Sequence, residues 1–309
     1  MKIRILLIAA VISVATIISS QAEEQDMVGR KLARSIPEEV VFCARLDLGV
    51  VRKNEESKKI LDTAREQFKE MLDSIGQFSA LDLVDVERIW ISVVKDKEAL
   101  VILEGNFDAD EILNSPVVTS SRKMARPGTL IAIEMKDEQK NELNYGVLIN
   151  GNIVAFGLPG LVDKFISLYA TEKTGWDKDG LAVMDSLAAS DAMIDISVMH
   201  LPEQEIKEKP FLGNLVNAQL QVNMVEKKIA ATAKLNMLDE EKAKAVKDLV
   251  SGIVVLGITS EIKVECPEIK KAILDGLKLG NEGRTATLSS GIGIDQLRDL
   301  LRSKGLDLK

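Results

Sequence analysis

The sequence predicts an α+β fold of two related units, each a largely antiparallel sheet with amphipathic helices packed on one face. Two kinds of segment support this class: short stretches in which apolar and polar residues alternate, and longer stretches with apolar residues three or four positions apart. Alternation is typical of strands, and the longer spacing is typical of helices. The same order of segments also recurs about 130 residues later in the chain, which predicts an internal duplication.

Alternation marks the first strand, in the sequence EEVVFCARLDL at residues 38–48. Phe42 and Leu46 fall on one face, whereas Arg45 and Asp47 fall on the other, which indicates a half-buried strand. Residues 57–78 then show the clearest helical spacing. Further strands are predicted as a hairpin at 88–105, which turns at KDKE, and at 129–137 and 144–157.

Short-range signals connect these segments. Asp108 followed by Glu111 predicts a helix N-cap, and Pro116 limits that helix to a few residues. Asn150-Gly151 predicts a hairpin turn of the primed type.

The second half repeats part of this order. A strand pair at 217–237 and a helix from 238 resemble the hairpin and helix of the first half, with Asn236 placed opposite Asn106. Residues 267–280 instead look helical where the first half has strands. The predicted organisation is a signal peptide at 1–22, a first α+β unit at 23–172, a linker region at 173–186 and a second α+β unit at 187–309.

The N-terminus has the pattern of an export signal. Lys2 and Arg4 precede an uncharged apolar run at 5–18, and small residues follow at Ser20 and Ala22. The run is shorter than the roughly 20 residues that a membrane-spanning helix needs. We therefore expect cleavage before residue 23 and a soluble periplasmic or secreted protein, with no stable membrane insertion after the signal is removed.

Charge narrows the range of partners. Cleavage removes two basic and no acidic residues, which changes the formal net charge from −8 to −10. Such an acidic protein lacks the basic surface that binds a polyanion, so we expect no nucleic-acid partner. The partner is expected to be an unknown protein or a small ligand.

The stretch NIVAFGLPGLVDKF, residues 152–165, is the nearest approach to a phosphate-binding motif. It lacks the lysine and hydroxyl of a phosphate loop and the spacing of a dinucleotide loop. The stretch TATLSSGIGIDQLRDLL, from residue 285, is its counterpart in the second half. We expect turn glycines that relieve backbone strain rather than a binding loop, at Gly157, Gly160, Gly291 and Gly293.

Other chemical signals are sparse. The sequence WDKDG at 176–180 matches part of a calcium loop, but the loop's first and twelfth positions lack carboxylates. His200 is the only histidine, so no ordinary zinc site can form, and no G-x-S-x-G sequence offers a serine for it to activate. We expect no metal, no cofactor and no catalytic residue.

Cys43 and Cys266 are the two cysteines, far apart in the chain. An exported protein can keep a disulfide, and this one would join the two units. Two unpaired, buried cysteines explain the sequence equally well. Both alternatives remain open.

These observations predict a non-enzymatic binding or structural protein of the cell envelope or the secreted space. The alternative is a hydrolase, or a carrier of small apolar ligands, that uses a cleft between the two units. A polar, convergent cleft would favour the hydrolase, and a closed apolar tunnel would favour the carrier. A filled junction would favour the non-enzymatic protein.

Overall fold

A computed structural model of the chain describes residues 23–53, 58, 84–94, 98–137, 142–201, 206–207, 213–225, 227–248, 251 and 276–296. The predicted signal peptide at 1–22 lies outside these residues, as does nearly all of the helix predicted at 57–78. Among the described residues, no helix is long and apolar enough to cross a membrane.

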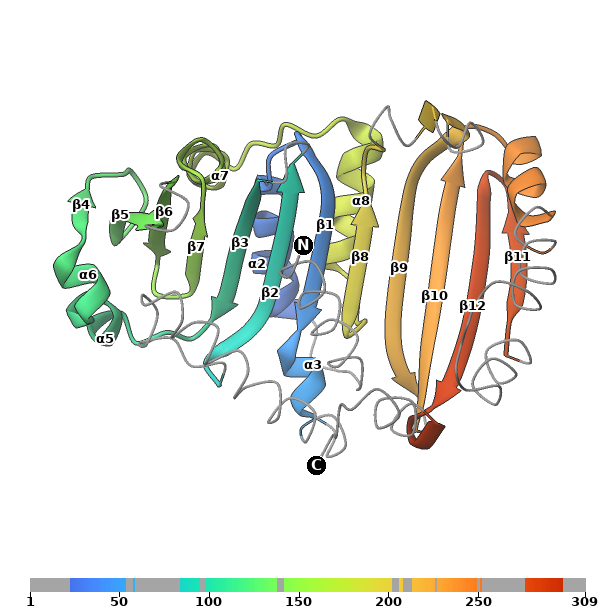
Figure 1. The fold of residues 1–309 in the computed structure, drawn as a ribbon, viewed down its shortest axis with the longest axis horizontal. Helices are drawn as coiled ribbons and strands as arrows, with labels where there is room; N and C mark the ends of the chain where they lie inside the picture. The colour runs from blue at the N-terminus through green and yellow to red at the C-terminus, as the bar shows by residue number, and fades with distance from the viewer. Residues whose placement is uncertain are drawn as a thin grey trace.

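The described chain contains both helices and strands (Figure 1). In the first half they are α2 (Glu23–Ser35), β1 (Val40–Asp47), α3 (Leu48–Arg52), β2 (Val86–Val94), β3 (Ala99–Gly105), α5 (Ala109–Asn114), α6 (Pro116–Ser120), β4 (Arg122–Met124), β5 (Ile131–Asp137), β6 (Glu142–Ile149), β7 (Ile153–Gly157) and α7 (Pro159–Thr171). In the second half they are α8 (Lys178–Ala188), β8 (Ile194–Val198), β9 (Leu215–Val225), β10 (Lys228–Met237), β11 (Lys278–Glu282) and β12 (Thr285–Gly293). Residues 240–248 are also helical.

The twelve strands of the described residues form one sheet in the order β11-β12-β10-β9-β8-β1-β2-β3-β7-β6-β5-β4. Every neighbouring pair is antiparallel. The predicted α+β class with a large antiparallel sheet is therefore confirmed. The two halves meet where β1 pairs with β8, with Ala44 opposite Ile196. Hydrogen-bonded strands, rather than a cleft, occupy this junction.

Both faces of the central sheet are buried. On one face, Trp90 and Ile102 pack with side chains of α2, α7 and α8, including Leu32, Phe165 and Met184. Figure 1 shows α2 and α8 behind the central strands. The opposite face carries a second cluster, in which residues of α3 pack on apolar side chains of β2, β3, β7 and β8.

Several local predictions are confirmed. The Asp108 side chain accepts hydrogen bonds from the backbone N–H groups of Asp110 and Glu111, which makes it the N-cap of α5. Asn150 and Gly151 have φ values of 52° and 70°, the left-handed conformations that a type I′ turn needs.

Two local predictions need correction. Residues 278–280, the end of the segment predicted to be helical, belong to β11 and pair with β12. Arg45 and Asp47 were expected on the open face of a half-buried strand. They are 1% and 7% exposed instead, because helices cover that face as well.

Candidate functional site

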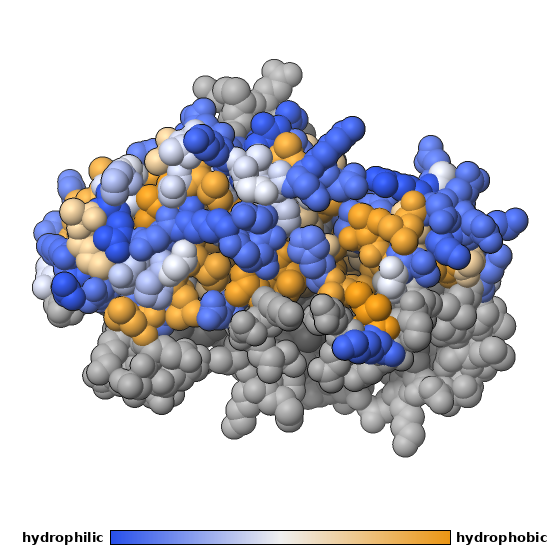
Figure 2. Space-filling model, turned by 90° about the horizontal axis from the view of Figure 1, so that it is seen from above, coloured by the Kyte–Doolittle hydropathy of each residue, from blue (hydrophilic) through white to orange (hydrophobic). Residues whose placement is uncertain are grey.

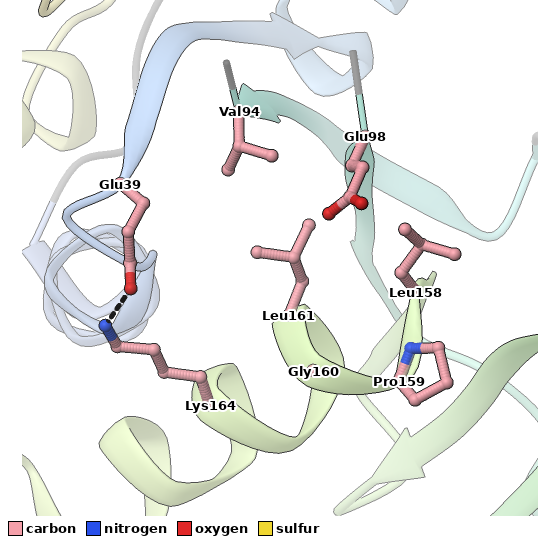
Figure 3. Close-up of a pocket in the computed structure, with 8 residues that line it drawn as sticks. All are labelled: Glu39, Val94, Glu98, Leu158, Pro159, Gly160, Leu161 and Lys164. Atoms are coloured by element: carbon pink, nitrogen blue, oxygen red, sulfur yellow. Dashed lines mark hydrogen bonds and ion pairs between the residues drawn. The ribbon is translucent and has the colours of Figure 1, made fainter. Parts of the chain in front are cut away.

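A cavity of about 610 Å³ lies at the start of α7. Its lining comes from three places in the fold: the residue before β1, the end of β2 with the residue before β3, and the start of α7. Figure 3 shows the side chains of Val94, Glu98 and Leu161 pointing into the same space. The lining residues are Glu39, Val94, Glu98, Leu158, Pro159, Gly160, Leu161 and Lys164.

The sequence explains why a helix begins here. β7 ends at Gly157, and Leu158 is an extended N-cap without a side-chain hydrogen bond to the helix. Pro159 at the first helical position needs no N–H partner and has a φ suited to a helix. Phe165 is buried against the sheet, whereas Leu161 is only half-buried and faces the cavity. The cavity therefore has a partly apolar floor.

Carboxylates dominate the charge at the cavity rim. Lys164 Nζ lies 2.9 Å from Glu38 Oε1 and also bonds Glu39 (Figure 3 shows the second contact). The hydrogen bond from Lys164 lowers the pKa of Glu38. Burial works to lower the pKa of Lys164, but its hydrogen bonds to Glu39 and Glu38 raise the pKa overall, so Lys164 stays protonated at neutral pH.

Glu98 has no ion-pair partner within the described part of the chain. Among the described residues, Glu39 and Glu98 of the lining and Glu38 beside it face one ammonium group, that of Lys164. The N-terminus of α7 adds only about half a positive charge. The net charge of these described groups is negative, which favours a cation and opposes phosphate.

The lining chemistry offers little for catalysis. The described lining residues include no hydroxyl, thiol or imidazole, and Lys164 bonds two carboxylates. Among the described lining residues there is no nucleophile within reach of a base.

In the view of Figure 2, hydrophobic residues of the described chain reach the surface in clusters between hydrophilic ones.

The buried ionic groups lie elsewhere, beneath α2 and α8. Arg45 Nη2 lies 2.9 Å from Asp195 Oδ2, with the two side chains 1% and 2% exposed. Arg45 also donates to the carbonyl oxygens of Ser190 and Ala192, at 2.6 and 2.9 Å. Asp195 Oδ1 in turn accepts from Ser190 Oγ and Gln221 Nε2. Burial raises the pKa of Asp195 against the opposing influence of Arg45.

A second group of charges continues this row. Arg88 bonds Asp47 at 3.0 Å and Glu104 at 2.8 Å. Burial raises the pKa of Glu104, although the charge of Arg88 opposes it. Burial works to lower the pKa of Arg88, but Glu104 and Asp47 together raise it. Arg88 and its two carboxylates bond one another across neighbouring strands. They therefore link the strands of the sheet and do not line the cavity at α7.

The four glycines singled out in the sequence do not share one role. None has a positive φ, which the described glycines adopt only at 128, 151 and 283. The expectation that they relieve backbone strain in turns is therefore wrong in its mechanism. Gly157 ends β7, where a Cβ would lie 2.5 Å from the backbone oxygen of Ala99, whereas a Cβ at Gly160 would meet nothing within 4 Å. Gly291 and Gly293 lie within β12.

The other residues considered in the sequence, Asp177 and His200, make contacts that stabilise the fold. Asp177 accepts a hydrogen bond from Gly180 N and is the N-cap of α8. His200 follows β8, and its ring stacks on Trp176 with centroids 6.5 Å apart. The described residues contain no group of three or more His, Cys, Asp or Glu side chains placed to hold a metal.

Cys43 is buried, and its Sγ lies 3.5 Å from Ser92 Oγ. Burial raises the pKa of Cys43 to about 12. Cys266 lies outside the described residues, so the pairing of the two cysteines stays a prediction.

Sequence reasoning missed both the cavity and the buried ionic row. Arg45 and Asp47 interrupt an apolar strand at alternate positions, a pattern that predicts the open face of a half-buried strand rather than a buried ionic row. Nothing in the sequence indicated that Glu39, Glu98 and Lys164 would meet, because three separate segments supply them.

Comparison with known proteins does not assign this chain to a family. No protein-family model matches the chain, and no curated protein matches it. Among solved structures, crystal forms I, III and IV of TP0453 resemble it with TM-scores of 0.47, 0.44 and 0.44, at 9%, 10% and 10% identity. The alignments cover 88%, 88% and 87% of this chain and 96%, 97% and 95% of those chains. Likenesses at this level establish neither a shared family nor a shared function.

Proposed function

We propose that the chain is an exported, non-enzymatic binding protein. The cavity at the start of α7 is its binding site for a basic group carried on an apolar stem. The observation that carries this proposal is the composition of the cavity lining, which pairs an apolar floor with unbalanced carboxylates. A lysine-like group fits both parts, because its stem packs on apolar surface while its charge remains at the rim.

The junction of the two halves supports this function over the alternative. A hydrolase or a carrier of apolar ligands was expected to use a cleft between the units. β1 and β8 fill that junction with paired strands instead. The cavity lies to one side, between α7 and the β2–β3 hairpin.

Export and duplication belong to the same proposal. The signal pattern at 1–22 supports removal of this segment, which would leave α2 at the start of the mature protein. The strand order supports duplication: β1-β2-β3 and β8-β9-β10 are both meanders, and the hairpins β6–β7 and β11–β12 add to their outer strands. In this interpretation the sheet is a rigid scaffold that holds the site.

Three small probes with the same six-carbon stem test the site: hexylammonium, hexanol and hexanoate. Binding to the mature chain is followed by the amide NMR shifts of Gly160 and Leu161. We expect hexylammonium to bind best and hexanoate worst. Glu98→Gln should weaken hexylammonium binding about two- to fivefold, the effect of an exposed ion pair.

Glu111→Gln is the matched control, because it removes the same charge from an exposed position on α5. It should leave hexylammonium binding unchanged. Equal affinity for hexylammonium and hexanoate, or an equal loss in both variants, would contradict the proposed site.

A further inference from the structure

Lys164 and Glu39 lie at one end of the cavity at the start of α7, and Glu98 lies at the other end. Figure 3 shows Leu161 between these two ends, with Val94 nearby. Leu161 and Lys164 are three residues apart in α7, so they lie on the same face of the helix. The described lining therefore has a carboxylate at each end and an apolar stretch between them.

The two carboxylates of the lining differ in their partners. Glu39 bonds Lys164, whereas Glu98 has no ion-pair partner within the described part of the chain. Lys164 Nζ also lies 2.9 Å from Glu38 Oε1, so Glu38 and Glu39 share one ammonium group. Of these two, Glu39 is the one that lines the cavity. Its contact with Lys164 therefore sets how much negative charge this end of the cavity offers to a ligand.

Lys164 is itself an ammonium group on an apolar stem, which is the chemistry proposed for the ligand. Its side chain is 34% exposed, and those of Glu38 and Glu39 are 40% and 52% exposed, so water reaches all three groups. An ion pair this exposed is worth roughly two- to fivefold in an equilibrium constant. A second ammonium group that took the place of Lys164 at Glu39 would gain nothing, because one exposed ion pair would replace another.

We propose that Lys164 determines which amines the cavity selects, by neutralising the end of the cavity at Glu39. This inference rests on the proposed function. A ligand with one ammonium group pairs with Glu98 and lays its stem on Leu161 and Val94. The second ammonium group of a linear diamine reaches Glu39 only by displacing Lys164, so it adds no affinity. The cavity therefore gives diamines and polyamines no advantage over amines with a single charge.

A comparison of hexylammonium with 1,6-hexanediammonium tests this role of Lys164. Binding to the chain without residues 1–22 is followed by the amide NMR shifts of Gly160 and Leu161. We expect the wild type to bind the two probes within about twofold of each other, the statistical advantage of a probe with identical ends. Lys164→Met frees Glu39, and it should bind the diammonium probe roughly four- to tenfold tighter than hexylammonium. The 1,4- and 1,8-diammonium probes are measured as well, because the gain requires a stem that spans both ends of the cavity.

Three further variants serve as controls. Lys164→Arg keeps the charge and should keep the wild-type ratio of the two affinities. Lys173→Met should keep this ratio too, because it removes the same charge from an exposed position just beyond the other end of α7. In the Lys164→Met background, Glu39→Gln should reduce the advantage of the diammonium probe.

The outcomes distinguish this inference from the function on which it rests. Failure of the wild type to bind hexylammonium would contradict both. If hexylammonium binds but Lys164→Met shows the wild-type ratio of affinities for every stem length, the role of Lys164 is overturned and the proposed function stands. A wild-type preference for a diammonium probe well above the statistical factor would also overturn that role. This last measurement needs no variant, so it decides the question even where a substitution impairs folding.

Discussion

Replacement of Arg45 by methionine isolates the contribution of the buried ionic row. The change removes the cation from Asp195, whose side chain is 2% exposed, and leaves the packing volume similar. A buried carboxylate without its cation costs about 3 to 5 kcal/mol of unfolding free energy. The electrostatic part of this cost has an upper limit, because Asp195 can take up a proton instead of staying charged. Protonating a carboxyl with an ordinary pKa of 3.8 at pH 7 costs about 4.4 kcal/mol, at 1.36 kcal/mol for each pH unit.

The pH dependence distinguishes this mechanism from a simple loss of packing. In the Arg45→Met protein, the pKa of Asp195 in the folded state rises further above its value in the unfolded state. The folded state then binds more protons, so its stability is greatest below pH 3.8 and falls as the pH rises. We expect the cost of the substitution, measured by urea unfolding, to be about 3 to 5 kcal/mol at pH 7.

At pH 4 the charge part of this cost should nearly vanish. The carbonyl oxygens of Ser190 and Ala192 still lose their donor, so a smaller, pH-independent cost should remain. Asp195→Asn in the Arg45→Met background should recover much of the loss at pH 7. An equal cost at both pH values, or a cost below about 1 kcal/mol at pH 7, would refute this reasoning.

Four further predictions concern a glycine, a helix cap, a cysteine and metal binding. Gly157→Ala should destabilise the fold by about 1 to 3 kcal/mol because its Cβ would meet the Ala99 oxygen, whereas Gly160→Ala should be neutral or slightly stabilising; equal effects in thermal unfolding would contradict this. Asp108→Ala should cost about 0.5 to 2 kcal/mol through loss of the α5 cap, and unchanged stability to urea would count against that role. Cys43, studied in a Cys266→Ser background, should resist thiol reagents at pH 8 until the protein unfolds, since its pKa is about 12; labelling of the native protein would show that the thiol is accessible. A chelator should leave the melting temperature unchanged, and a fall that zinc or calcium reverses would reveal a metal site.

Strands could be predicted where apolar and polar residues alternate regularly, as in β1, β2, β3, β9 and β10. The Asn150-Gly151 turn and the Asp108 cap could be predicted because each depends only on neighbouring residues. The segment at 267–280 was harder, because strand β11 is short and depends on pairing with β12 for its conformation. The intrinsic conformational preference of a few residues does not reveal whether they will pair with a neighbouring strand.

The candidate site was not predictable by the same means. Arg45 in an alternating strand indicates a solvated face, unless a distant segment covers it and supplies carbonyl acceptors, as α8 and the residues that follow it do. Likewise, the sequence around Gly160 predicts a helix start but not the carboxylates of Glu39 and Glu98, which lie just before β1 and β3. Both features depend on contacts between segments far apart in the chain.

Intermolecular NOEs between hexylammonium and the chain without residues 1–22 test the binding site most directly. The proposed function predicts NOEs from the methylene groups of the probe to the methyl groups of Val94 and Leu161, with the ammonium end toward Glu98. The same probe should show no chemical change after prolonged incubation. NOEs confined to other parts of the protein, or none at saturating probe, would contradict a binding site at the start of α7.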